Sequence, residues 1–228
     1  MDNIGHMTIY KEQPFFQDRA DAGRRLADKL VQYQAGEVIV LAIPRGGVPV
    51  AIEVANRLGA PLDVVVPRKI TIPYNPEAGY GAVTEDGTMV LNEPLVKRLA
   101  LTKHQIQQQA KEVQAEIARR TAIYRSSLPV SSVEGKTVII IDDGLASGFT
   151  MIAAIKSMER WKVARTVVAV PVASGTAYDL VKPLVHELVC LVVARTYQFA
   201  VASFYHNWYD LTDEEVVKYL EAWRTKHL

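Results

Sequence analysis

The fold is decided by the stretch Val138-Ile139-Ile140-Ile141-Asp142-Asp143-Gly144-Leu145-Ala146-Ser147-Gly148-Phe149-Thr150. Its first four residues are apolar, as in a strand that is buried on both faces of a parallel sheet. Two carboxylates follow directly, then a loop of small residues, and then the start of a predicted helix. In open α/β sheets, ligands bind beyond the carboxyl ends of the strands. The stretch therefore predicts a parallel α/β sheet with a ligand site at residues 142–150.

The residue types in this stretch suit a phosphorylated sugar. Free backbone N–H groups at the start of a helix attract phosphate, and the hydroxyls of Ser147 and Thr150 add donors. The carboxylates of Asp142 and Asp143 can accept hydrogen bonds from paired sugar hydroxyls or hold hydrated Mg²⁺. A plain turn is the alternative, because turns favour Asp and Gly. Two adjacent acids at the end of an apolar strand are more than a turn requires.

Apolar runs alternate with helical stretches along the rest of the chain, which is typical of a sheet covered by helices. We predict strands at residues 38–43, 62–66, 138–141, 166–170 and 188–194. We predict helices at residues 15–33, 48–58, 102–124, 150–160, 177–184 and 212–223. The pattern indicates an α/β fold, with a mostly parallel twisted sheet and helices on both faces, in a single domain over residues 1–228.

Three segments depart from this alternation. Residues 69–92 are rich in Pro and Gly and predict a long loop and a hairpin with its turn at 85–88. Residues 102–124 predict a polar helix whose narrow apolar stripe leans on the body of the protein or on a second subunit. Residues 196–228 predict a small hood and a final helix. Aromatic side chains of the hood either stack on a planar base or belong to the core or a dimer interface; they are Phe199, Phe204, Tyr205, Trp208 and Tyr209.

The stretch at 138–150 resembles the motif that binds phosphoribosyl pyrophosphate (PRPP) in type I phosphoribosyltransferases, where two acids precede a loop of the Ala-Thr-Gly-Gly-Thr kind. Here Ser147 replaces Thr, and Phe149 stands where Gly is common. The resemblance implies the Rossmann-like fold of that family. It also implies that Asp142 and Asp143 hold the ribose hydroxyls and contact Mg²⁺, directly or only through PRPP and water. The residues that would cradle PRPP in this loop are Gly144, Leu145, Ala146, Ser147, Gly148, Phe149 and Thr150.

Two further motifs fit this resemblance. Pro44-Arg45-Gly46-Gly47 follows the first predicted strand, and its glycine N–H groups and the Arg45 guanidinium suit pyrophosphate. Arg68 and Lys69 end the second predicted strand, as does an Arg-Lys pair in adenine- and orotate-type members. With Asp142 and Asp143, this pair makes up the predicted catalytic set. The alternatives are an ordinary strand-to-helix turn and a solvated basic strand end.

The whole chain also looks like a family of predicted phosphoribosyltransferases of undefined substrate. The shared landmarks lie at residues 41–51, 68–70, 75–77, 81–83 and 213–216. We therefore expect a Mg²⁺-dependent enzyme that moves the 5-phosphoribosyl group from PRPP to a nitrogenous, nucleobase-like acceptor and releases pyrophosphate. A non-catalytic protein of the same fold that senses PRPP or a nucleotide is the alternative.

The acceptor is less well defined. Members that use 6-oxopurines usually carry Asp where this chain has Ala146, which disfavours hypoxanthine and guanine. Glu77 or Glu85 would serve as general acid or base, unless both are solvated loop residues.

Composition excludes several other classes. The formal net charge of +1 gives no general electrostatic footprint for nucleic acid, and no apolar stretch approaches the ~20 residues that span a bilayer. We expect a cytoplasmic protein without a membrane or nucleic-acid partner, and a homodimer by family habit. The single cysteine, Cys190, lies in an apolar run and is predicted to be buried and inert. Neither a Gly-x-Gly-x-x-Gly nor a Walker loop is present, which disfavours a dinucleotide site and a Walker-type kinase.

Overall fold

A computed structural model of the chain describes residues 7–9, 14–72, 75–126 and 132–227. In this part of the chain the main sheet has six strands, all parallel, in the order β1-β9-β8-β7-β2-β3. The strands are β1 (Met7–Ile9), β2 (Val38–Ala42), β3 (Leu62–Val64), β7 (Thr137–Ile141), β8 (Arg165–Ser174) and β9 (Glu187–Ala194). The predicted parallel sheet is confirmed, and the short edge strand β1 is an addition to it.

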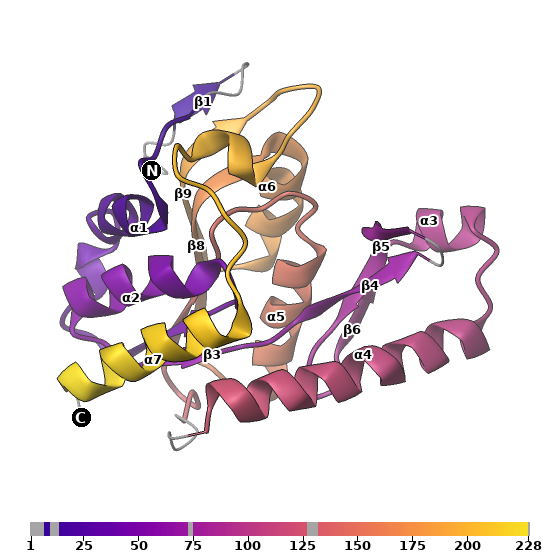
Figure 1. Ribbon diagram of the computed structural model, residues 1–228, viewed down its shortest axis with the longest axis horizontal. Coiled ribbons are helices and arrows are strands. Elements are labelled where there is room, and N and C mark those ends of the chain that lie inside the picture. The colour runs from indigo at the N-terminus through magenta and orange to yellow at the C-terminus, as the bar shows by residue number, and fades with distance from the viewer. Residues whose placement is uncertain (1–6, 10–13, 73–74, 127–131, 228) are drawn as a thin grey trace.

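Helices cover both faces of this sheet (Figure 1). One face carries α1 (Arg19–Ala27), α2 (Gly47–Leu58) and α7 (Asp213–His227), whereas α5 (Phe149–Arg160) and α6 (Gly175–Val181) cover the other. Short 3₁₀ helices occur at Val31–Tyr33, Lys182–Leu184 and Val201–Phe204. The observed arrangement is the predicted α/β architecture.

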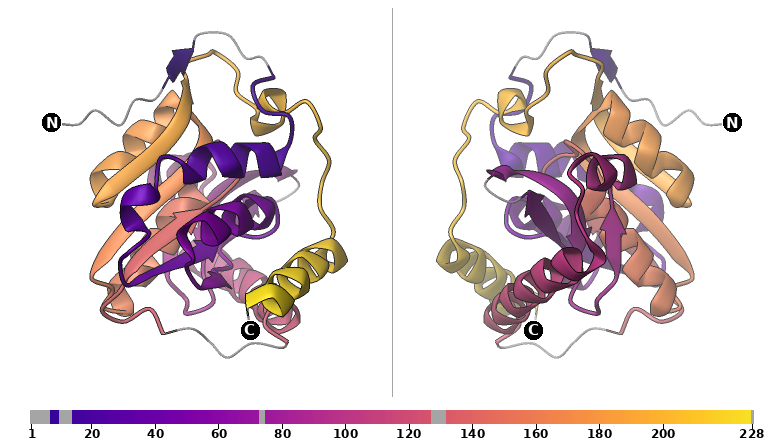
Figure 2. Two further views of the ribbon diagram at one scale, coloured as in Figure 1. Left: turned by 90° about the vertical axis from the view of Figure 1, so that its left-hand side faces the viewer. Right: turned by 90° about the vertical axis from the view of Figure 1, so that its right-hand side faces the viewer.

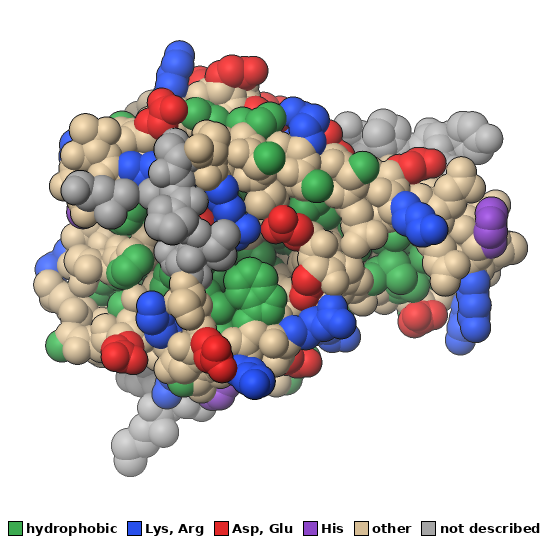
Figure 3. Space-filling model, turned by 90° about the horizontal axis from the view of Figure 1, so that it is seen from below, with side chains coloured by type: hydrophobic (Ala, Val, Ile, Leu, Met, Phe, Trp, Pro, Cys, Tyr) green, Lys and Arg blue, Asp and Glu red, His purple; other side chains and the backbone are tan. Residues whose placement is uncertain are grey.

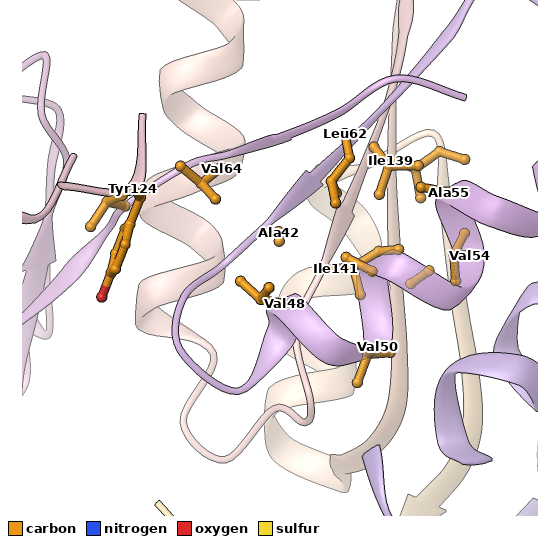
Figure 4. Close-up of a cluster of buried hydrophobic side chains, with 14 of the residues drawn as sticks. Ala42, Val48, Val50, Val54, Ala55, Leu62, Val64, Tyr124, Ile139 and Ile141 are labelled. Carbon is orange, nitrogen blue, oxygen red and sulfur yellow. The ribbon is translucent and has the colours of Figure 1, made fainter. Parts of the chain in front are cut away.

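The core follows from the alternation of side chains along each strand. In β2, Val40 and Ala42 face the layer of α2, whereas Ile39 and Leu41 face the layer of α5. Successive residues of a strand point to opposite faces, so a strand covered on both sides is apolar throughout. Figure 4 shows side chains of β2, α2, β3 and β7 converging in the first of these layers.

A second, antiparallel sheet lies within the segment for which a long loop was predicted, so that prediction was wrong. Its strands are β4 (Arg68–Ile72), β5 (Asn75–Val83) and β6 (Met89–Leu91). The glycines that suggested a loop instead permit close strand contact, because a Cβ atom on Gly81 would lie 2.5 Å from the carbonyl oxygen of Val90. The predicted hairpin turn is confirmed, since the N–H of Thr84 donates to the carbonyl of Thr88 at 3.0 Å.

Two helices stand beside this small sheet. The short helix α3 (Glu93–Arg98) was not predicted, whereas α4 (Lys103–Tyr124) begins at the expected cap, Thr102. Most of the apolar stripe of α4 is buried. The helix contacts β4, β5 and α7 of this chain, and Figure 2 shows it beside the small sheet. The stripe therefore packs on the body of the protein and gives no evidence for a second subunit. The homodimer stays a prediction.

Helix α1 is shorter than the predicted 15–33. The carboxylate of Asp18 accepts from the N–H of Asp21 at 2.8 Å and so starts the helix at Arg19. Phe16 instead pairs with Tyr205 as an isolated bridge, which keeps the chain before the helix extended. Among the described helices, none has the length and apolar character needed to cross a bilayer.

Candidate active site

The predicted site motifs meet where the connections of the main sheet change direction. From β2 the chain passes through α2 to β3 on one side, and from β7 it passes through α5 to β8 on the other. Strands β2 and β7 are parallel neighbours, so the loops that follow them start side by side. The N–H of Ile43 donates to the carbonyl of Ile141 at 2.8 Å across this junction. Such a switch point is where open α/β sheets bind ligands.

The two acids of the β7 loop are held in place by defined partners. The Oδ1 atom of Asp142 accepts from the N–H of Asp143 at 2.8 Å. The Oδ2 atom of Asp143 accepts from the Nε atom of Arg19 at 2.8 Å, and both side chains are largely buried, at 13% and 8% exposure. The hydroxyl of Tyr205 donates to the carbonyl oxygen of Asp143 at 2.6 Å. The pair thus has a fixed orientation before any ligand binds.

Burial also sets the charge of this pair. It raises the pKa of the Asp142 carboxyl well above its usual value, and the negative charge of Asp143 raises it further. Burial raises the pKa of Asp143 as well, although the charge of Arg19 opposes that shift. Among the described residues, Arg19 forms an ion pair with Asp143 and no cation forms one with Asp142. Hydroxyl donors or a cation that reached Asp142 would therefore stabilise its charged form.

The β2 loop touches the acids closely enough to require its glycines. A Cβ atom on Gly46 would lie 1.8 Å from Oδ2 of Asp143. A Cβ atom on Gly47 would lie 2.7 Å from the carbonyl oxygen of Ile141. The peptide bond between Pro44 and Arg45 is cis. Residues 44–47 thus pack directly on the acidic pair, as their place at the switch point requires.

The remainder of the β7 loop lines a cavity of about 380 Å³. Its walls are Lys69, Ala78, Gly79, Gly81, Gly144, Leu145, Ala146, Ser147, Gly148, Phe149 and Thr150. Leu145 is pinned to β8, because its N–H donates to the carbonyl of Val172 at 2.9 Å. Gly148 has φ +81° and precedes the first residue of α5, Phe149. The early N–H groups of this helix adjoin the cavity, an arrangement that suits a phosphate.

A second cavity, of about 250 Å³, lies against the β2 loop. It is lined by Pro44, Arg45, Val66, Pro67, Arg68, Lys69, Arg120 and Tyr124. Lys69 borders both cavities. Its side chain lies over β5, where a Cβ atom on Gly79 would be 2.2 Å from its Cγ atom. The three predicted cations Arg45, Arg68 and Lys69 are therefore brought to one place.

Comparisons with known proteins agree with this geometry. A family model described as "Phosphoribosyl transferase domain" matches residues 16–207. The chain belongs to the phosphoribosyl transferase domain family. Two curated Mycobacterium tuberculosis proteins, each named "Putative phosphoribosyl transferase", from strains CDC 1551 and H37Rv, are 38% identical to it over 206 residues. This match covers 90% of the chain and 46% of each relative, so the chain spans about half the length of these curated relatives.

A solved structure gives the same result for the fold. The crystal structure of TT1426 from Thermus thermophilus is 38% identical and superimposes with a TM-score of 0.76. The match covers 92% of this chain and 99% of that one. The chain thus shares its α/β fold with TT1426 over nearly the whole of that structure.

The phosphoribosyltransferase motif departs from the common pattern at Phe149 without distorting the loop. Phe149 is the first residue of α5, and its side chain packs partly buried against the core. The left-handed position in this loop is Gly148, which retains glycine. A bulky residue at 149 is therefore compatible with the conformation of this loop.

Two residues of this site were missed from the sequence. Arg19 reaches Asp143 from α1, and Arg120 enters the second cavity from α4. The sequence did contain a signal for Arg19. It lies on the same helix face as the apolar residues Ala22 and Leu26, and a charged residue is unusual on a buried face. Arg120 gave no local signal, since its surroundings come from segments distant in the sequence.

The predicted aromatic hood divides into core and site residues. Phe204 and Tyr205 are buried at 0% and 4% exposure, which supports the core alternative for both. The ring of Trp208 lies under the guanidinium of Arg19, with 3.9 Å from Cζ to the ring centroid. Trp208 therefore stabilises the cation that holds Asp143.

Of the two candidate acid–base residues, the structure describes the side chain of Glu85 alone. Glu85 lies on the hairpin turn and forms an ion pair with Arg125 at 3.5 Å, and it lines neither of the two cavities. The side chain of Glu77 lies outside the described residues. Cys190 is buried, which raises its thiol pKa to about 12, so the prediction of an inert thiol is supported.

Proposed function

We propose that this chain transfers the 5-phosphoribosyl group of PRPP to a nitrogen atom of a nucleobase-like acceptor. The bond between ribose C1 and a pyrophosphate oxygen breaks, and a bond between C1 and the acceptor nitrogen forms. Pyrophosphate leaves with its electron pair, and the acceptor nitrogen loses a proton. Transfers at an anomeric carbon pass through an oxocarbenium-like state, so the protein must stabilise the leaving group.

One observation carries the proposal. Lys69 borders both a cavity built from the β7 loop and a cavity lined by Arg45 and Arg68. PRPP has the matching form, a sugar with a single phosphate at one end and a pyrophosphate at the other. We assign the 5-phosphate to residues 144–150 and the pyrophosphate to the cationic cavity. The ribose hydroxyls would then donate to Asp142 and Asp143.

The cations perform the electrostatic part of the reaction. Charge builds up on the pyrophosphate as the C1–O bond breaks, and fixed cations stabilise it without reorganising. The N–H group of Gly46 would add a donor at the same place, whereas the N–H group of Gly47 already donates to the carbonyl of Ile43 at 3.1 Å. A covalent nucleophile is not needed, which is consistent with the inert Cys190.

Mg²⁺ fits the residues present as an ion that arrives with the substrate. Within the described part of the chain, no cluster of three or more His, Cys, Asp or Glu side chains could hold a metal by itself. Asp142 and Asp143 offer the oxygen ligands that Mg²⁺ prefers, and Asp142 has no ion-pair partner among the described residues. When bound, Mg²⁺ would neutralise charge on the leaving pyrophosphate.

The acceptor is assigned only by class. Ala146 supplies no carboxylate at the position that 6-oxopurine members use, which favours an acceptor other than hypoxanthine or guanine. We extend the proposal to a homodimer on the basis of family habit, with a cytoplasmic location as the default expectation.

Calorimetric titration with Mg²⁺ and PRPP tests the donor site. Wild-type protein should bind saturably, and the double variant Asp142→Asn/Asp143→Asn should lose binding while keeping its far-UV circular dichroism spectrum. Pyrophosphate release would then be measured across a panel of bases. Binding without release for any base would favour the sensor, and a folded wild-type protein that does not bind PRPP would overturn the proposal.

A further inference from the structure

The cationic cavity has a wall that the PRPP motifs do not supply. Its other walls come from the β2 loop and from residues 66–69, between β3 and the start of β4, but Arg120 and Tyr124 come from the last turns of α4. This helix lies outside the main sheet, beside β4, β5 and α7 (Figure 1). The Arg120 side chain is only 18% exposed, compared with 36% for Arg45 and 35% for Arg68. Arg120 is therefore a fixed part of this wall.

The cavity concentrates positive charge. Arg45, Arg68, Lys69 and Arg120 line it, and no Asp or Glu among the described residues does so. The whole chain has a formal net charge of only +1, so this excess is local. Burial lowers the pKa of Arg68, and the positive charge of Arg120 lowers it further, although the charge of Glu116 opposes that shift. Two like charges on one cavity wall repel each other. A multivalent anion in the cavity would relieve this repulsion.

Two carboxylates behind the cavity wall partly compensate the cations. Glu116 contacts Arg68 at 3.2 Å and Arg120 at 2.8 Å. Asp213, the first residue of α7, contacts Arg120 at 3.4 Å and Arg45 at 3.9 Å. Basic and acidic side chains accordingly lie close together on the face that carries α4 and α7 (Figure 3). Each carboxylate is shared by several guanidiniums, and a guanidinium has more N–H donors than these contacts use, so Arg45, Arg68 and Arg120 can also bind a ligand.

We propose that Arg120 is a pyrophosphate-binding residue, held toward the cavity by Glu116 and Asp213. This inference rests on the proposed function, because it assigns the anion of the cationic cavity. The carboxylates orient the guanidinium in the free protein, and the pyrophosphate takes the donors that remain. Helices α4 and α7 thereby become part of the substrate site.

Arg119 provides a matched control on the same helix. Its guanidinium contacts the same two carboxylates, Glu116 at 2.8 Å and Asp213 at 3.4 Å. It differs from Arg120 in being 52% exposed and in lining neither of the two site cavities. Arg119→Gln and Arg120→Gln therefore remove equivalent ion pairs, and only the second removes a cavity cation.

The experiment is calorimetric titration with inorganic pyrophosphate and Mg²⁺, and separately with ribose 5-phosphate. Arg120→Gln should weaken pyrophosphate binding by about tenfold or more, as expected for a lost hydrogen bond between charged groups. Arg119→Gln should change it by less than about twofold. Neither variant should change the affinity for ribose 5-phosphate, which lacks the pyrophosphate group.

The outcomes separate this inference from the proposed function. Equal pyrophosphate affinities in the two variants, or equal losses for pyrophosphate and ribose 5-phosphate in Arg120→Gln, would overturn the role of Arg120 while leaving the PRPP site intact. Wild-type protein that binds pyrophosphate but not PRPP would support Arg120 if only Arg120→Gln weakened that binding, and would overturn the transferase proposal. Wild-type protein that binds neither ligand would overturn both.

Discussion

The Nε atom of Arg19 lies 2.8 Å from the Oδ2 atom of Asp143, which joins helix α1 to the loop after β7 across 124 positions of sequence. The same guanidinium donates to the carbonyl of Tyr209 at 2.9 Å and stacks on Trp208. A buried acid of the proposed sugar site thus depends on a cation from a distant helix.

Replacing Arg19 with Leu should lower the free energy of unfolding by about 3 kcal/mol, because breaking a buried ion pair leaves an uncompensated charge. Urea unfolding measures this change. Arg24→Leu is the matched control on the same helix, since Arg24 is 58% exposed and lies 3.6 Å from Glu53. It should change stability by no more than about 1 kcal/mol. Equal losses in the two variants would show that the Arg19–Asp143 pair contributes no more to stability than an exposed ion pair does.

We predict that replacing Gly46 weakens the binding of PRPP. In Gly46→Ala, the new methyl group would lie 1.8 Å from Oδ2 of Asp143, so the acid or the loop must move. Affinity for PRPP with Mg²⁺ should fall about tenfold or more, equivalent to ~1.4 kcal/mol, in a calorimetric titration. Gly36→Ala serves as control, because the nearest atom to its Cβ would be 3.7 Å away. Unchanged affinity in Gly46→Ala would mean that the β2 loop does not set the position of the acids.

The parts of this site that could be predicted from the sequence are those with a local cause. A strand buried on both faces must be apolar, so β7 could be predicted from its composition. The polar and small residues directly after it, 142–150, then predicted the ligand loop. The two neighbouring motifs followed because parallel strands end at the same edge of the sheet. Chain order alone then accounts for the packing of Gly46 on Asp143 and for the meeting of Arg45 and Lys69 in one cavity.

The parts that could not be predicted depend on contacts between distant segments. Glycines at 79 and 81 suggested a loop, but each is needed where another group packs against the strand, Lys69 in one case and the backbone of Val90 in the other. Arg120 is surface-like in sequence and becomes a cavity residue only because α4 packs on β4. Composition gives no access to such tertiary contacts.

Asp142 is expected to reduce the stability of the free protein near neutral pH. Its pKa is raised in the folded state, mainly by burial, above the ~3.9 of an unfolded chain. The folded protein therefore keeps a proton that the unfolded chain has released, and the free energy of unfolding falls as pH rises from ~4 toward the folded pKa. Asp142→Asn removes this dependence and retains the oxygen that accepts from the N–H of Asp143. Its stability relative to wild type should thus increase with pH.

Thermal unfolding of the two proteins between about pH 4 and pH 7, without ligand, measures this difference. A stability difference that is constant over this range would show that Asp142 has an ordinary pKa in the fold. A wild-type protein that gains stability over the variant as pH rises would show that a cation compensates the Asp142 charge. The double variant Asp142→Asn/Asp143→Asn should follow the same direction, because the Asp143 pKa is raised as well.

Lys69 is the residue whose loss should affect both ends of the donor, because it borders both cavities. Lys69→Met removes the ammonium and keeps an unbranched stem that can lie over Gly79. Calorimetry should show weaker binding of ribose 5-phosphate and of pyrophosphate with Mg²⁺, each by about tenfold or more for one lost charged contact. Lys97→Met, on an exposed face of α3, should leave both affinities unchanged. A loss confined to pyrophosphate would place Lys69 with Arg45 and Arg68 alone, and the two cavities would then not share a cation.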